Sequence, residues 1–464
     1  MRLALPRSLH LTYVRAHLRD ILRLALPASL ESVVQLVFNF FAQLIVATLG
    51  ATAVAAVGFS NNVTLMAIFT LGTLGSGAGI LVARAHGARD KGAVARTTST
   101  ALTLSTLVTL ALTLLLVVFA HPVLGALGAP ADLSRTAAPF FQVALLGVPL
   151  IVLSVVIGSV MRSLEQPRVP MFATFLAAIV NVALSFALVR GFGGLPELGL
   201  VGAAWGALAG QALRLMVLFW FLYGRRGLVR WAWPTLGKDT RTLIGELLHL
   251  SLPLAATQLA WSGGNLLYAL LLARLGTAIL AGVQVAYTLE GIFVVASFGL
   301  VPAATALIGQ AVGQGNAKLA RERARAVERF GLFTGVVFGG LFALTAFALP
   351  TLYPAVGAQV REVAFGTILL NATIQVAKVA NLVRGGGVLP SGSDTRGVLM
   401  GDATSAFAVG LPLAWLLAFG FGLGVWGVLL ARVAEELVKV AIFAWRARKL
   451  AWPRVVEEQA LQVA

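Results

Sequence analysis

Acidic side chains inside long apolar stretches are the first feature of this sequence that could do chemistry. Only 18 aspartates and glutamates are present, and most of them lie at the ends of such stretches. Glu290 and Glu31 lie well inside, whereas Asp402, Glu435 and Glu436 lie in shallower positions. A charge at the bilayer centre costs roughly 2.5–3.5 kcal/mol, so each carboxylate must be paired, hydrated or protonated. Reversible binding of a proton or a cation is the chemistry that these groups can supply.

Glu290 and Glu31 are the acids best placed for this role. Glu290 lies about twelve residues into the apolar stretch 278–312, roughly 18 Å along a helix. Glu31 follows Pro27 by one turn, and a proline bends a helix because it removes a backbone hydrogen bond. Each carboxyl is either an inward-facing group that couples to an ion or a substrate, or a structural acid between helices.

Neutral polar residues in the same stretches are further candidates for an internal site. Amide and phenol groups can bind substrates or ions, but they also form hydrogen bonds of modest strength between helices. Both interpretations stay open for these residues, which are Asn39, Asn181, Asn265, Gln258, Gln284 and Tyr287.

Basic residues inside apolar stretches are rarer. Lys378 either extends its ammonium group toward the cytoplasmic face or pairs internally with Asp402 or Glu290 and titrates against it. Arg214 is the other internal cation. A third group, Arg432, Glu435, Glu436 and Lys439, has the i, i+3, i+4, i+7 spacing of one helix face, which predicts a structural ion-pair network.

Several other kinds of chemistry are excluded by residue type and spacing. The chain has no cysteine, and its five histidines are scattered without metal-ligand spacing. No glycine-rich phosphate loop with a lysine is present, so ATP hydrolysis is not expected. The net charge of +17 comes from short basic clusters between apolar stretches, a pattern that indicates membrane topology and not nucleic-acid binding. No enzymatic activity, metal or cofactor is therefore predicted.

The elements that must position these residues are transmembrane helices. Hydrophobic residues make up 59% of the chain and charged residues 11%, with a mean hydropathy of +0.90, whereas a soluble domain has roughly 25% charged residues. Each apolar stretch can cross about 30 Å of hydrocarbon. The predicted spans are 22–49, 52–84, 94–120, 134–160, 169–190, 200–222, 244–275, 278–312, 327–350, 360–387, 397–420 and 425–445. Lysines and arginines gather in alternate loops and at both ends, so both termini are predicted to be cytoplasmic.

An internal repeat divides these spans into two sets of six. LRLALPASLESVVQLVFNFFAQLIVATLG ends at Gly50, and LLHLSLPLAATQLAWSGGNLLYALLLARLG ends at Gly276, a shift of 276 − 50 = 226. The same shift aligns Pro27 with Pro253, Asn39 with Asn265 and Gly87 with Gly313, whereas Trp205 pairs with Trp426 later in each half. The predicted domains are a cytoplasmic amphipathic segment 1–21, an N-lobe 22–225, a linker 226–243, a C-lobe 244–448 and a cytoplasmic tail 449–464. A substrate site at mid-membrane between two such lobes is typical of transporters.

Motifs along nearly the whole chain resemble the multidrug and toxic compound extrusion (MATE) family, within the multidrug/oligosaccharidyl-lipid/polysaccharide exporter superfamily. The segments that carry the resemblance include ATALIGQAVGQGNAKLAR, TLEGIFVVASFGLVPAA, GGVLPSGSDTR and GSVMRSLEQPRVPMFATF. The resemblance implies an all-α integral membrane fold of twelve helices in two six-helix lobes. It also implies alternating access and the cation- or proton-coupled export of amphiphilic, often cationic, organic compounds.

The chain departs from the family where coupling acids are usual. Ala42 and Ser185 stand at the positions of two aspartates of the proton-driven branch, and the acids of the sodium-linked branch in spans seven and ten are absent. Sodium needs several oxygen ligands, usually with a carboxylate among them, whereas proton coupling needs one carboxyl. Low dielectric disfavours the charged form of a carboxyl, so Glu290 or Glu31 can serve. Protons are therefore the expected coupling ion, with sodium as the alternative.

The resulting prediction is a multidrug efflux antiporter of the plasma membrane, expected to be a monomer. The alternative within the same superfamily is a flippase for a lipid-linked precursor, whose cavity would need several inward cations. Only Arg214 and Lys378 are candidates for such cations.

Overall fold

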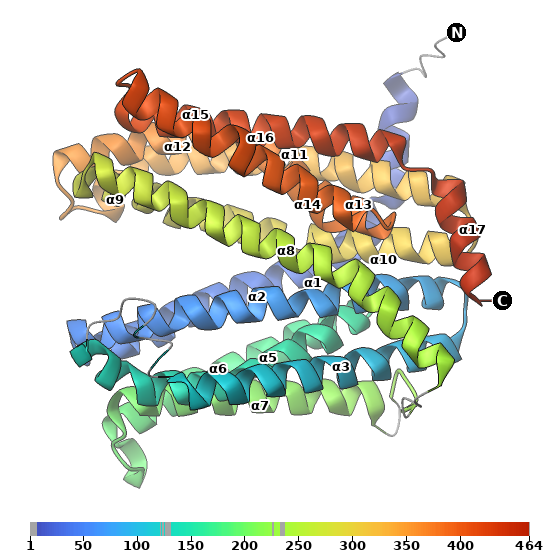
Figure 1. The fold of residues 1–464 in the computed structure, drawn as a ribbon, viewed down its shortest axis with the longest axis horizontal. Helices are drawn as coiled ribbons and strands as arrows, with labels where there is room; N and C mark the ends of the chain where they lie inside the picture. The colour runs from blue at the N-terminus through green and yellow to red at the C-terminus, as the bar shows by residue number, and fades with distance from the viewer. Residues whose placement is uncertain are drawn as a thin grey trace. The chain divides into compact units, whose positions relative to one another are not determined.

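The computed structural model describes residues 7–120, 122, 125, 131–224, 227–232 and 237–463, and every regular element within them is a helix (Figure 1). The first half contains α1 (Arg7–Ala47), α2 (Ala51–Gly87), α3 (Lys91–Val118), α5 (Ala131–Ser163), α6 (Arg168–Arg190), η1 (Phe192–Gly194) and α7 (Gly199–Tyr223). The second half contains α8 (Lys238–Leu275), α9 (Thr277–Ser297), α10 (Leu300–Gly313), α11 (Ala317–Leu352), α12 (Ala358–Val383), η2 (Arg384–Val388), α13 (Leu389–Ser391), α14 (Thr395–Ala403), η3 (Thr404–Gly410), α15 (Leu411–Trp415), η4 (Leu416–Gly420), α16 (Gly424–Lys449) and α17 (Trp452–Val463).

Eleven helical segments of the described chain are long and apolar enough to cross a membrane. The remaining long helix is α16, whose 26 residues also suffice for a crossing. Its middle carries four charged residues, Arg432, Glu435, Glu436 and Lys439, which set it apart from the apolar segments. The all-α membrane fold predicted from the sequence is confirmed, and a crossing by α16 is consistent with the predicted count of twelve.

Prolines explain where the later spans depart from regular α-helix. The predicted span 278–312 is divided between Ser297 and Leu300, four residues before Pro302, whose ring clashes with the carbonyl of residue 298. The π-helical turns η2 and η3 likewise end two residues before Pro390 and Pro412, which cannot donate a backbone hydrogen bond. The three interrupted spans contain the candidate residues Glu290, Lys378 and Asp402.

The internal repeat predicted from the sequence also appears in the backbone. Gly50 and Gly276 lie between consecutive helices with φ of 98° and 131°, a region that favours glycine. The helix after Gly50 ends at Gly87. The two helices after Gly276, which are separated at residue 298, end at Gly313. All these positions are 226 residues apart, so the two halves share the same turns.

Helix caps follow the same shift. The Asp90 side chain accepts a hydrogen bond of 2.8 Å from the backbone N–H of Ala93 at the start of α3. The Asn316 side chain accepts one of 2.9 Å from Leu319 at the start of α11. Such caps satisfy a backbone donor that has no partner within the helix. The shift of 316 − 90 = 226 therefore relates local structure as well as sequence.

Packing divides the chain into two compact units, Leu30–Ala255 and a second unit formed by Met1–Ser29 with Ala256–Ala464. The division falls inside α1 and α8, two residues beyond Pro27 and Pro253, and its two positions are again 226 residues apart. The lobe boundaries 22–225 and 244–448 remain predictions from the sequence repeat.

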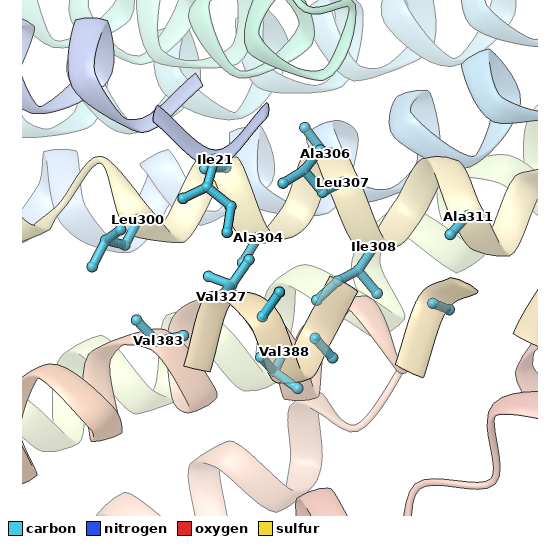
Figure 2. Close-up of a cluster of buried hydrophobic side chains, with 14 of the residues drawn as sticks. Ile21, Leu300, Ala304, Ala306, Leu307, Ile308, Ala311, Val327, Val383 and Val388 are labelled. Atoms are coloured by element: carbon cyan, nitrogen blue, oxygen red, sulfur yellow. The ribbon is translucent and has the colours of Figure 1, made fainter. Parts of the chain in front are cut away.

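One apolar core of the second unit collects segments that are distant in sequence (Figure 2). Ile21 from α1, Leu307 from α10, Val327 from α11 and Val388 from η2 are all buried in it. Trp452 and residues near it in α17 belong to the same core. The segment 449–464, predicted as a tail, therefore includes a helix that packs against the unit.

Candidate functional site

Glu290 and Lys378 form an ion pair between α9 and α12. The Lys378 Nζ lies 2.5 Å from Oε1 of Glu290, and the two side chains are 20% and 7% exposed. Lys378 also donates a hydrogen bond of 3.3 Å to Oδ1 of Asn371, seven residues earlier on the same face of α12. Of the alternatives left open by the sequence, the structure shows internal pairing with Glu290 and not with Asp402.

Close packing of α11 holds α12 in place beside this pair. Gly331, Gly335 and Gly339 lie at four-residue intervals on α11, a pattern that lets helices in membranes approach closely. A Cβ atom at Gly335 would lie 2.7 Å from the Cα of Val376, and one at Gly339 would lie 2.8 Å from the carbonyl oxygen of Ala372. Larger residues would therefore push away the helix that carries Lys378.

A second set of polar contacts surrounds α16. Glu435 accepts a hydrogen bond of 2.7 Å from the hydroxyl of Tyr268 and lies 3.5 Å from Arg432. Arg432 donates a 2.9 Å hydrogen bond to Asn265 and stacks over the Tyr268 ring, 4.4 Å from its centroid. These contacts bring Asn265 from α8 to a charged face of α16.

The same face of α16 contacts two further helices. Lys439 lies 2.8 Å from Asp402 of α14 and 3.9 Å from Glu435. Glu436 accepts a 2.7 Å hydrogen bond from Asn381 of α12. Of the predicted network on α16, the Arg432–Glu435 and Glu435–Lys439 pairs are present, and the structure adds partners from α8, α12 and α14.

Electrostatic interactions connect the Glu290–Lys378 pair to the α16 contacts. Glu436 interacts with Lys378, Lys439 and Arg432, and Tyr287 of α9 lies near Arg432. We call the combined set the C-terminal polar cluster. Its members are Asn265, Tyr268, Tyr287, Glu290, Asn371, Lys378, Asn381, Asp402, Arg432, Glu435, Glu436 and Lys439.

The charges of the C-terminal polar cluster do not balance. It contains four carboxyl groups and three cationic side chains, so with every group in its usual form at neutral pH the net charge is 3 − 4 = −1. An uncompensated buried charge is costly. The cluster is therefore suited to take up one further positive charge, and a proton is the smallest that can supply it.

The other unit contains a separate cluster around Glu31, which we call the N-terminal ion cluster. One oxygen of the Glu31 carboxylate lies 3.0 Å from Arg162 of α5, and the other lies 2.8 Å from Arg214 of α7. The Thr174 hydroxyl donates a further hydrogen bond of 3.1 Å to this carboxylate. Two arginines and one glutamate leave this cluster with a net charge of +1.

The remaining candidates from the sequence lie outside these two clusters. Asn181 accepts a hydrogen bond of 3.1 Å from the Ser185 hydroxyl one turn later on α6. Gln258 is half-buried, and the Asn39 and Gln284 side chains are exposed. The structure therefore brings Asn265, Tyr287, Glu290, Lys378 and Asp402 together and leaves the other five candidates apart.

Several cluster members were not predicted. Arg162 lies two residues beyond the predicted span 134–160, but α5 continues through Ser163 and directs this side chain to Glu31. Asn371, Gln375, Lys378 and Asn381 share one face of α12, and polar residues at helical spacing within an apolar stretch could have identified this face. Among the described residues, no three histidine, aspartate or glutamate side chains are grouped as a metal site.

Comparison with known proteins agrees with the fold and the repeat. A model of the MatE family matches residues 27–187 and 253–416, two ranges that begin 253 − 27 = 226 residues apart. The chain is 29% identical to a probable multidrug resistance protein NorM of Bradyrhizobium diazoefficiens, over 93% of each protein. It is 30% identical to the probable multidrug resistance protein NorM of Deinococcus radiodurans, over 89% of this chain and 91% of that one.

Solved structures of similar fold include the eukaryotic MATE transporter AtDTX14, with a TM-score of 0.84 and 17% identity over 97% of this chain and all of that one. An outward-facing multidrug resistance MATE family transporter has a TM-score of 0.84 and 20% identity, over 93% of this chain and 96% of that one. At these identities the structures establish a shared fold. The family match covers most of both halves of the chain. This chain therefore belongs to the MatE family of membrane transporters.

Proposed function

We propose that this chain is a secondary active multidrug exporter that moves amphiphilic, often cationic, organic compounds out of the cell in exchange for protons. Relatives named as multidrug resistance proteins support the export of small organic compounds. The positively charged loops favour a plasma-membrane protein with both termini in the cytoplasm. The two related halves support alternating access by a monomer around a site near mid-membrane.

The charge balance of the C-terminal polar cluster is the observation that carries the choice of protons. Four carboxyls face three cations, so one proton neutralises the cluster. When the cluster faces the outside it takes up a proton, and when it faces the cytoplasm it releases the proton and can attract a cationic substrate. Sodium, the alternative ion, needs several oxygen ligands, and Lys378 already occupies one side of the Glu290 carboxylate.

Glu290 fits the role of proton carrier better than Glu31. The carboxylate of Glu31 is bound by two guanidinium groups, whereas Glu290 has a single cationic partner that lies near a second carboxylate, Glu436. Protonation of Glu290 therefore leaves Lys378 with another partner, but protonation of Glu31 would leave two buried arginines without one. We expect Glu31 to remain charged during transport.

Transport by reconstituted protein tests this function. In proteoliposomes, an imposed proton gradient should drive uptake or release of a fluorescent cation, and a sodium gradient at fixed pH should not. Glu290→Gln should abolish gradient-driven transport while weak substrate binding remains, because the amide mimics the protonated acid. Glu328→Gln is the matched control, since Glu328 also forms an ion pair in the same unit, with Arg384, but is more exposed than Glu290. Full proton-driven export by Glu290→Gln would refute the role of this residue.

A lipid-linked precursor remains the second candidate substrate, and the N-terminal ion cluster is the observation that favours it. The cluster contains two arginines, Arg162 and Arg214, and one glutamate, so its net charge is +1, which suits an anionic group. Translocation of a lipid-linked anionic precursor by the same proteoliposomes, without transport of organic cations, would support this second function over the first.

A further inference from the structure

The Lys378 ammonium group lies where a free cation would bind the Glu290 carboxylate. It contacts Oε1 of Glu290 at 2.5 Å and Oδ1 of Asn371 at 3.3 Å, so two oxygens from two helices converge on one positive charge. Oxygen atoms of carboxylates and amides are also the ligands that hard metal cations prefer. The chemistry around Nζ is therefore that of a cation site whose occupant is part of the chain.

Unsatisfied polar atoms next to this pair indicate that the site has more donors and acceptors than Lys378 uses. Gln375 lies one turn after Asn371 and one turn before Lys378 on the same face of α12, and its side chain is fully buried. Within the described part of the chain, neither amide atom of Gln375 has a hydrogen-bond partner, and Nδ2 of Asn371 has none either. Buried polar groups normally have partners, so this face of α12 retains unused binding capacity.

We infer that the Lys378 ammonium is a built-in counter-cation that occupies the Glu290 site and so excludes sodium and other free cations from it. An ammonium and a monovalent metal ion have the same charge, so one carboxylate is fully compensated by either. Because Lys378 is covalently tethered, its effective concentration at Glu290 exceeds that of any ion in solution. A second cation at the same carboxylate would also be repelled by the first.

This inference deepens the proposed function and rests on it for its meaning in transport. Glu436 interacts electrostatically with Lys378 and provides a second carboxylate for the ammonium. When Glu290 takes up a proton, Lys378 turns toward Glu436, and when Glu290 loses the proton, Lys378 returns. The tethered ammonium then performs inside the protein the charge movement that a bound sodium ion would otherwise perform.

Removal of the ammonium should create a sodium site. Purified full-length protein in detergent is heated in NaCl or in choline chloride at equal ionic strength, and unfolding is followed by tryptophan fluorescence. The wild type should show no difference between the two salts. Lys378→Ala should melt about 2 °C higher in saturating NaCl, because a ligand that binds the folded state stabilises it. Lys378→Arg should behave as the wild type does.

Two controls test whether the sodium-dependent rise in melting temperature comes from the Glu290 carboxylate. The double variant Lys378→Ala/Glu290→Gln should lose the sodium-dependent shift, since it lacks the carboxylate. Arg384→Ala removes another cation from the same stretch of chain, and its partner Glu328 is more exposed, so no sodium site should appear. An equal sodium shift in the wild type, or a folded Lys378→Ala without any shift, would overturn the inference.

Folding of the variants is itself informative. If Lys378→Ala folds in NaCl but not in choline chloride, sodium replaces the ammonium, as the inference requires. If neither Lys378→Ala nor the bulkier Lys378→Met folds in either salt, the ammonium has a structural role that no free cation can fill, and the inference fails. The binding assay does not involve transport, so a failure of proton-driven export with the expected sodium shifts would refute only the proposed function.

Discussion

Removal of the Glu31 carboxylate tests the N-terminal ion cluster most directly. Glu31→Ala leaves the guanidinium groups of Arg162 and Arg214 near each other with no carboxylate between them. Breaking a buried ion pair by removing one partner costs about 3–5 kcal/mol. The Arg162 side chain is 17% exposed and can turn toward water, whereas Arg214 is 5% exposed and cannot. We therefore expect the lower end of this range, a loss of about 3 kcal/mol in the free energy of unfolding.

The assay is reversible unfolding in mixed micelles, followed by circular dichroism, with each variant compared to the wild type. The double variant Glu31→Ala/Arg214→Met should recover most of the loss, because it replaces the buried charge with an apolar side chain of similar length. Glu197→Ala, in an exposed position of the same unit, is the control and should be neutral. A Glu31→Ala protein as stable as the control variant would show that the cluster does not stabilise the unit.

Three further predictions address packing, topology and the repeat. Gly335→Val should lower the melting temperature and the folded yield, measured by fluorescence-detected size exclusion, because its side chain would meet the α12 backbone at Val376; a yield equal to the wild type contradicts the tight α11–α12 contact. In this cysteine-free chain, Phe421→Cys should react with an impermeant thiol reagent in intact cells and Gln314→Cys should not, and labelling of the second would refute the predicted orientation. Asn316→Ala should cost about 1 kcal/mol of stability through loss of the α11 cap, measured by the same unfolding assay, and no change would exclude that role.

The fold followed from the sequence because its signals are local and repeated. Apolar stretches determine where helices form in a bilayer, since each backbone group must find its partner within the helix. Gly50 and Gly276 mark equivalent turns because their positive φ angles favour glycine. The division of span 278–312 before Pro302 was not predicted, although the proline was visible. The ends of helices were harder to predict, as α5 shows at Arg162.

The candidate site was predicted only in part because its contacts join helices that are far apart in sequence. The pairing of Lys378 with Glu290 was one of several possibilities, and 88 residues separate the two. Spacing within α16 predicted contacts along that helix, but the hydrogen bond from Tyr268 depends on how α8 packs against it. Arg162 was missed for the same reason, since its partner Glu31 lies 131 residues away. Periodicity identifies the face of a helix, whereas tertiary packing chooses what that face meets.

The two halves share their turns and differ in their charges. At the shift of 226, the position of Glu31 corresponds to Thr257 and the position of Glu290 corresponds to Thr64, and both threonines are buried. At the shift of 221 that aligns the tryptophans of the last spans, Arg214 corresponds to Glu435.

Each unit therefore has a buried glutamate where the other unit has a buried threonine. In addition, the internal cation Arg214 of one unit corresponds to the acid Glu435 of the other. The resulting net charges are +1 around Glu31 and −1 in the C-terminal polar cluster. A carboxylate held by two arginines is suited to fix the packing of its unit, because any loss of its charge is costly. The shared turns preserve the repeated helices of both units, and under the proposed function the exchange of charges lets the C-terminal polar cluster, and not the N-terminal ion cluster, take up the proton.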